Sequence, residues 1–170
     1  MNNRHFISLP RERQAQLKAQ FPELRELAEE GSANGVQHIA VSVFDHWLSV
    51  DEAIAEIDEV SLDSQRVNDA KLHAFTCGLA SRSQCYLVKF KGRHHQHATF
   101  RAFTSDSARN RWLTPLPYNI GDKWRFQLVF PQLEMVYFEG SDFTHHIYLK
   151  HSIGQRVVEE AAIGSGVYVL

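Results

Sequence analysis

The sequence has few cysteines, no long hydrophobic run and no glycine-rich phosphate-binding motif. Its two cysteines, Cys77 and Cys85, are too few for a disulfide framework, so we expect free thiols in a reducing compartment. No apolar run approaches the ~20 residues of a membrane-spanning helix, and the stretch MNNRHFISLPRER lacks the apolar segment of a signal peptide. We therefore expect a cytoplasmic protein with no membrane partner.

The motifs that mark common catalytic and metal sites are also missing. The sequence contains no Gly-x-Ser-x-Gly, Ser-x-x-Lys, Cys-x-x-Cys or His-Glu-x-x-His pattern. We expect no cofactor and no bound metal, and we favour a binding protein over an enzyme. The enzymatic alternative is a metal-independent ribonuclease that uses histidine as general acid or base. Its candidate catalytic residues are His94, His95, His97, His145 and His146.

Charge is distributed unevenly along the 170 residues, although the net charge is only −2. Residues 1–81 hold 7 Lys or Arg and 13 Asp or Glu, residues 82–125 hold 9 and 2, and residues 126–170 hold 2 and 5. Clustered charge determines which partners a surface attracts. The basic central third therefore favours an anionic partner.

Residues 84–103, in this basic third, have the pattern of a β-hairpin. Side chains alternate with a period of two on both sides of Gly92, and glycine gives the backbone freedom that a tight turn needs. Cations and aromatic side chains are interleaved on the hairpin and beyond it. The candidate nucleic-acid-binding residues are Lys89, Lys91, Arg93, Arg101, Arg109, Arg111, Lys123, Arg125, Tyr86 and Trp112.

Such a surface is suited to nucleic acid, because cations contact phosphates and exposed aromatic rings stack on unpaired bases. No RNP-type or helix-turn-helix motif accompanies it. We therefore expect a small nucleic-acid-associated binding protein whose partner is RNA or single-stranded DNA.

The acidic N-terminal part offers a different function, that of a protein–protein inhibitor or adaptor. Acidic helical surfaces can dock a basic protein partner by charge complementarity. The residues expected to form this surface are Glu23, Glu26, Glu29, Glu30, Asp51, Glu52 and Glu56.

The first half of the chain, residues 1–82, is predicted to be mainly helical. Ser8 is placed to cap a first helix, and Ser49 and Glu52 have the spacing of a capping box that opens another. A further helix is predicted over residues 64–80. The stretch 36–44 alternates apolar and small or polar residues, which predicts a strand that buries Ile39, Val41 and Val43.

The second half, residues 83–170, is predicted to consist mainly of β-strands. After the hairpin, the alternation in 123–130, 133–140 and 143–150 predicts a three-stranded antiparallel meander, followed by a short helix and an edge strand. The whole chain is predicted to form one α+β domain. Its N-terminal helices would pack on one face of a mainly antiparallel sheet of about five to seven strands.

Overall fold

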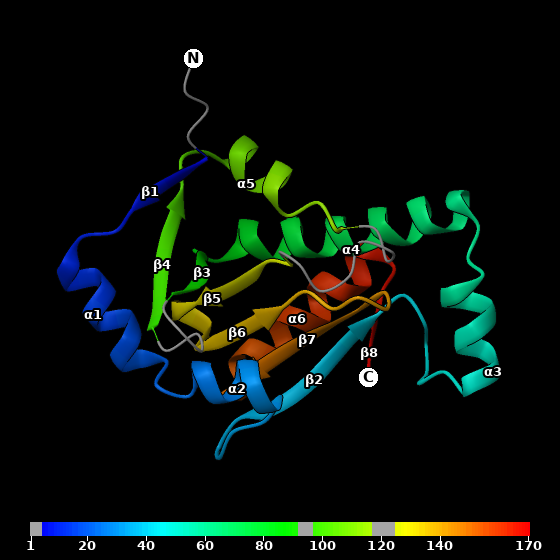
Figure 1. Cartoon of the computed structure of the whole chain (residues 1–170), viewed down its shortest axis with the longest axis horizontal. Helices are drawn as coiled ribbons and strands as arrows, with labels where there is room; N and C mark the ends of the chain where they lie inside the picture. The colour runs from blue at the N-terminus through cyan, green and yellow to red at the C-terminus, as the bar shows by residue number, and fades with distance from the viewer. Residues whose placement is uncertain (1–4, 92–96, 117–124) are drawn as a thin grey trace.

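The computed structural model describes residues 5–91, 97–116 and 125–170, and within them eight strands form one antiparallel sheet (Figure 1). The strand order across the sheet is β1-β4-β3-β5-β6-β7-β2-β8. The strands are β1 (Phe6–Ser8), β2 (Gln37–Ser42), β3 (Tyr86–Lys91), β4 (His97–Phe103), β5 (Gln127–Phe130), β6 (Met135–Phe138), β7 (Thr144–Leu149) and β8 (Tyr168–Val169).

Helices connect these strands and cover both faces of the sheet. They are α1 (Arg11–Gln20), α2 (Leu24–Glu30), α3 (Val50–Ala53), the π-helical turn η1 (Ile54–Asp58), α4 (Leu62–Arg82), α5 (Asp106–Trp112), the 3-10 turn η4 (Pro131–Leu133) and α6 (Ser152–Ser165). The α+β class is confirmed. The described strands exceed the expected five to seven, and the placement of all N-terminal helices on one face is wrong, because α1 and α2 pack opposite α4.

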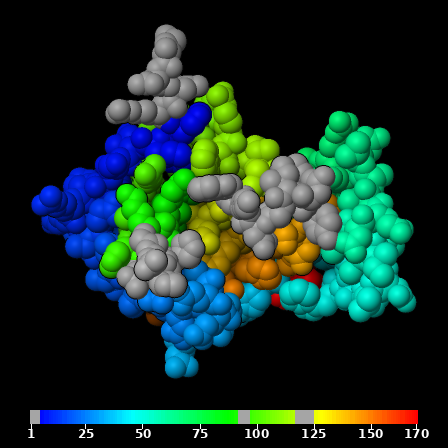
Figure 2. Space-filling view, in the orientation of Figure 1, coloured from blue at the N-terminus to red at the C-terminus, as the bar shows by residue number. Residues whose placement is uncertain are grey.

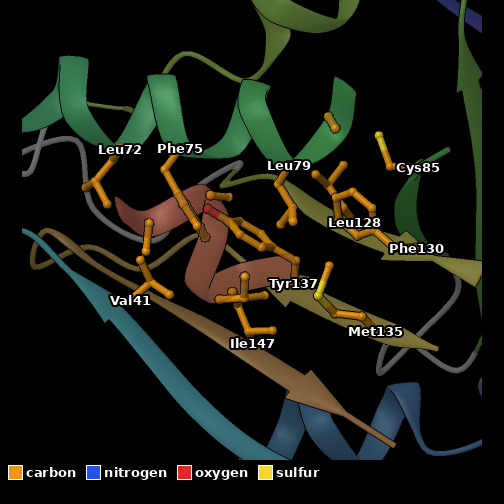
Figure 3. Close-up of a cluster of buried hydrophobic side chains, with 14 of the residues drawn as sticks. Val41, Leu72, Phe75, Leu79, Cys85, Leu128, Phe130, Met135, Tyr137 and Ile147 are labelled. Carbon is orange, nitrogen blue, oxygen red and sulfur yellow. The ribbon is translucent and has the colours of Figure 1, made fainter. Parts of the chain in front are cut away.

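The larger core lies between the sheet and helices α4 and α6 (Figure 3). Leu72, Phe75 and Leu79 of α4 point toward the strands, where Val41 and Tyr137 are fully buried. Burying apolar surface at this scale is the main source of folding free energy. This core joins side chains of β2, β3, β5, β6 and β7 to the two helices.

The smaller core lies on the opposite face, under α1 and α2. Leu17 and Phe21 of α1 and Leu24 and Leu27 of α2 are buried there. They contact apolar side chains from five strands: Tyr86, Val88, Phe100, Val129, Val136 and Tyr148. A sheet covered on both faces needs apolar residues at consecutive positions, which is why Tyr86, Leu87 and Val88 are all buried.

Local sequence signals predicted most elements of the first half. Residues Ile39, Val41 and Val43 are buried on or beside β2, as expected. The Ser49 hydroxyl accepts a hydrogen bond from the Glu52 N–H, and the Glu52 carboxylate accepts one from the Ser49 N–H, which completes the capping box. Helix α4 extends the predicted 64–80 helix at both ends.

Two local predictions need correction. Ser8 does not cap α1, because it belongs to β1 and pairs with Arg101, and the N-cap position is Pro10. The strand predicted over 123–130 is β5, which begins at Gln127, while residues 123 and 124 lie outside the described residues. The other strands of the predicted meander, β6 and β7, pair as expected.

Among the described residues, no helix combines the length and apolar character that crossing a membrane requires.

Candidate functional site

The β3–β4 hairpin places three of the predicted cations on one face of the sheet. Leu87 pairs with Arg101, and Lys91 pairs with His97. Directly paired residues share a face, and so do residues two apart on a strand, so Lys89, Lys91 and Arg101 lie on the side that carries Leu87. Helix α4 covers this side further along the sheet, where Leu87 joins its core. Arg101 lies opposite Leu87 at the edge of that core, and Lys89 and Lys91 follow toward the turn of the hairpin.

Helix α5 brings an aromatic ring against these cations. Ser105 caps the helix by accepting a hydrogen bond from the Ala108 N–H at 3.1 Å. Trp112 closes the helix, and its ring meets the Phe6 ring edge-on at a centroid distance of 4.6 Å. The Lys89 ammonium lies over the Trp112 ring, 5.4 Å from the centroid, in a cation–π contact. Strands β1 and β3 and helix α5 thus form one packed unit.

We call Lys89, Lys91, Arg101, Arg111 and Trp112 the basic cluster. Lys91 and Arg111 are exposed, and Lys89 and Arg101 are half-buried. Trp112 keeps 36% of its surface exposed. Burial, and then the nearby Arg101 charge, lower the pKa of Lys89. Like charges held this close favour an anionic partner that would neutralise them.

A cavity of about 630 Å³ adjoins the basic cluster. It opens where β3 runs past the start of β5, since these strands pair only through Tyr86 and Leu87. Its wall combines cationic and apolar side chains, which include Lys89, Phe90, Arg111, Trp112, Pro115, Leu116, Arg125 and Phe126. A volume of this size falls in the range of small-ligand pockets.

A buried ion pair forms the floor of this cavity. The Glu139 side chain is almost fully buried and accepts hydrogen bonds at 2.9 Å from the N–H groups of Leu116 and Phe126. The Arg125 guanidinium lies 3.7 Å from the Glu139 carboxylate and donates to the Gly140 carbonyl at 2.9 Å. Burial raises the pKa of Glu139, while the two N–H groups and Arg125 oppose that rise. The positive charge of Arg125 therefore compensates the buried Glu139 carboxylate.

Three residues predicted for the interface have other roles. Tyr86 points to the α1–α2 face, is buried, and lies under the guanidinium of Arg13. Arg109 is largely buried, donates to the Ala80 carbonyl at 3.1 Å and pairs with Asp106 at 3.0 Å. Arg125 pairs with Glu139, as described above. Arg93 and Lys123 lie outside the described residues.

The acidic residues predicted for a protein-binding surface fall into two separate groups. Glu23, Glu26, Glu29 and Glu30 belong to α2 or its N-cap on one face of the sheet, and Glu23 forms an ion pair with Lys150 at 2.9 Å. Asp51, Glu52 and Glu56 belong to α3 and η1, which lie at the far end of α4 (Figure 1). These residues do not form one continuous surface.

The three candidate catalytic histidines that the structure describes, His97, His145 and His146, do not converge on one site. His145 is fully buried in the core and is hydrogen-bonded to the Tyr137 hydroxyl, which also bonds to Thr76. His146, the next residue on β7, points to the opposite face and lies 3.1 Å from His38, nitrogen to nitrogen. His97 begins β4 and pairs with Lys91 of the basic cluster. His94 and His95 lie outside the described residues.

Metal-binding geometry is likewise not found in the part of the chain that the structure describes. Within residues 5–91, 97–116 and 125–170, no three His, Cys, Asp or Glu side chains are grouped so that they could hold a metal ion. The His38–His146 pair supplies two nitrogens, whereas structural and catalytic zinc sites use at least three protein ligands.

Sequence reasoning missed two residues that shape the site. Phe6 supports Trp112 from the edge strand β1, and Glu139 holds the backbone on both sides of residues 117–125. Glu139 ends an apolar alternating run, and a carboxylate at the edge of a core usually has a cationic partner. That pattern signals a buried ion pair but does not identify Arg125.

No protein-family model, curated protein or solved structure matches this chain. The chemistry of the basic cluster and its cavity is therefore the basis for a functional proposal.

Proposed function

We propose that this protein binds single-stranded nucleic acid, RNA or DNA, through the basic cluster. The observation that carries the proposal is the group of four cations on β3, β4 and α5, of which Lys89 lies over the Trp112 ring, beside a cavity of about 630 Å³. Cations in such an arrangement contact successive phosphates, and binding releases the counterions that the phosphates had condensed.

The cavity favours an unpaired strand over a duplex. Trp112 contributes aromatic surface to its wall, and Lys89 and Arg111 flank it with positive charge. A base that is not held in a duplex can enter such a pocket and stack there while its phosphate meets the cations. Stacking on aromatic rings tolerates any base, so we expect weak sequence preference.

Replacing Lys89, Lys91, Arg101 and Arg111 together with Gln is expected to weaken binding to single-stranded RNA at least tenfold at low salt. The plot of log affinity against log salt should become less steep by about 0.7 for each phosphate contact that is lost. Affinity should fall for all sequences alike, because phosphate contacts position a strand without reading its bases. Fluorescence anisotropy with labelled oligonucleotides at several salt concentrations measures both quantities.

The matched control changes three exposed charges of the opposite sign on the other face of the sheet, in a Glu26→Gln, Glu29→Gln and Glu30→Gln variant. This variant should keep or slightly improve binding. The thermal melting of both variants should stay close to that of the wild type, because the replaced side chains are exposed or half-buried. An unchanged affinity and salt slope in the basic-cluster variant would show that the proposal is wrong.

A further inference from the structure

A helical arm projects from the body of the protein at the end opposite β1 and β4 (Figure 1). We define the arm as residues 45–63, which include α3 and η1. Figure 2 shows it standing out from the rest of this face. All of its residues are described, and no residue of α3 or η1 is buried. Its inner side, with Ile57 and Val60, packs partly against the main core.

The arm exposes four large apolar side chains. Trp47 is 61% exposed, Val50 78%, Ile54 43% and Leu62 72%. Val50 and Ile54 are four residues apart, so they are neighbours on one helical face. Single exposed apolar residues are ordinary, but several of them on one short projecting segment mark an interaction surface.

Charge on the arm restricts what can cover this apolar face. The arm carries seven carboxylates, Asp45, Asp51, Glu52, Glu56, Asp58, Glu59 and Asp63, and its sequence contains no Lys or Arg. Like-charge repulsion disfavours nucleic acid and anionic lipid headgroups on such a surface. A partner that covers the apolar row and also neutralises the carboxylates must combine apolar and cationic side chains.

The start of the arm is rigidly built, which lowers the entropy cost of binding there. The Glu52 carboxylate accepts hydrogen bonds from the N–H and the hydroxyl of Ser49 at 2.8 and 2.7 Å. These bonds, together with one from His46, lower the pKa of Glu52 to about 2. His46 also contacts Asp45 at 2.6 Å, and the two carboxylates raise its pKa. Trp47 and Val50 are thus presented on either side of an ordered cap.

We propose that the arm docks a basic amphipathic helix of a partner protein. An apolar row on the partner, at helical spacing, would pack along Val50 and Ile54, and Lys or Arg on its flanks would meet the carboxylates. The arm lies away from the basic cluster, so this interaction is independent of nucleic-acid binding.

The probe is a labelled helical peptide of Leu and Lys, about 18 residues long, with Leu at i, i+3, i+4 spacing. Fluorescence anisotropy with the full-length protein should show saturable binding at low ionic strength. A peptide of identical composition in scrambled order should bind at least tenfold more weakly, because it has no continuous apolar face. Equal affinity for the two peptides, or no binding of either, would refute the proposal.

The decisive variant is Val50→Asp with Ile54→Asp, and we expect it to bind the peptide at least tenfold more weakly. This result would separate apolar docking from simple charge attraction, since the variant is more acidic than the wild type. The matched control makes the same changes at exposed Ile153 and Ile163 of α6 and should bind normally.

Sedimentation of the protein alone tests whether a second copy of this chain, and not a partner protein, covers the arm. Self-association that is lost in the Val50→Asp, Ile54→Asp variant would assign the face to a second copy and overturn the proposal.

Discussion

Val41→Asp is expected to leave almost no folded protein. Val41 is fully buried near the C-terminal end of β2, where it pairs with His145 and Val169 and packs in the core under α4 and α6. An unpaired carboxylate at this position costs several kcal/mol, which is comparable with the ~5–15 kcal/mol that stabilises a whole domain. Soluble yield and thermal melting followed by circular dichroism measure the effect.

Val67→Asp makes the same chemical change at a position on α4 that is 56% exposed. This control should express and melt like the wild type, because its carboxylate stays in water. A Val41→Asp protein with normal yield and an unchanged melting temperature would contradict the inward orientation of Val41.

The second large effect is a loss of stability in mild acid. Burial, and secondarily the nearby His146 and Arg125, lower the pKa of His145 from 6.5 to about 3. The unfolded chain therefore binds a proton at His145 well before the folded protein does. His145 therefore does not reduce the free energy of unfolding above pH 6.5. As the pH drops from 6.5 toward 3, protonation of His145 in the unfolded chain lowers the free energy of unfolding, by about 2 kcal/mol at pH 5. His38 acts in the same direction, since burial and His146 lower its pKa.

Two carboxyl groups oppose this trend. Burial raises the pKa of Glu139 and of Asp69, so each is protonated more readily in the folded protein than in the unfolded chain. Their contribution to stability increases as the pH falls through these raised values. The contribution of His145 must therefore be isolated by a variant.

Urea unfolding of the wild type and of His145→Leu at pH 7.5 and 5 makes this separation. The variant should lose less stability than the wild type between the two pH values, whatever its starting stability. Proton NMR of the wild type should show no titration of the His145 ring between pH 5 and 8. A ring that titrates near pH 6.5 in the folded protein would contradict the burial of His145.

The sequence predicts those parts of the fold that local patterns determine. The β3–β4 hairpin, β2 and the capping box at Ser49 follow from alternation and short-range hydrogen bonding, and the structure has all three. The two-sided coverage of the sheet was missed, although three consecutive buried residues, Tyr86 to Val88, are typical of it. Alternation of apolar and polar residues indicates a sheet with one covered face, so all N-terminal helices were predicted to lie on a single face.

The candidate site shows the same division between local and distant causes. The hairpin register alone groups Lys89, Lys91 and Arg101, and alternation also turns Tyr86 to the other face. The ion pair of Arg109 with Asp106 lies within one helical turn, so it was predictable in principle. The pairing of Arg125 with Glu139 was not, because it depends on the exact register of the neighbouring strands β5 and β6, which alternation does not determine.

The proposed function rests on the basic cluster, and nucleic-acid binding by the wild-type protein as a function of salt tests it most directly. Filter binding should be measured with single-stranded RNA, single-stranded DNA and duplex DNA at two salt concentrations. We expect both single strands to bind at low salt, the duplex to bind more weakly, and all affinities to fall steeply as salt rises. Absence of binding to every nucleic acid at low salt would contradict the proposal.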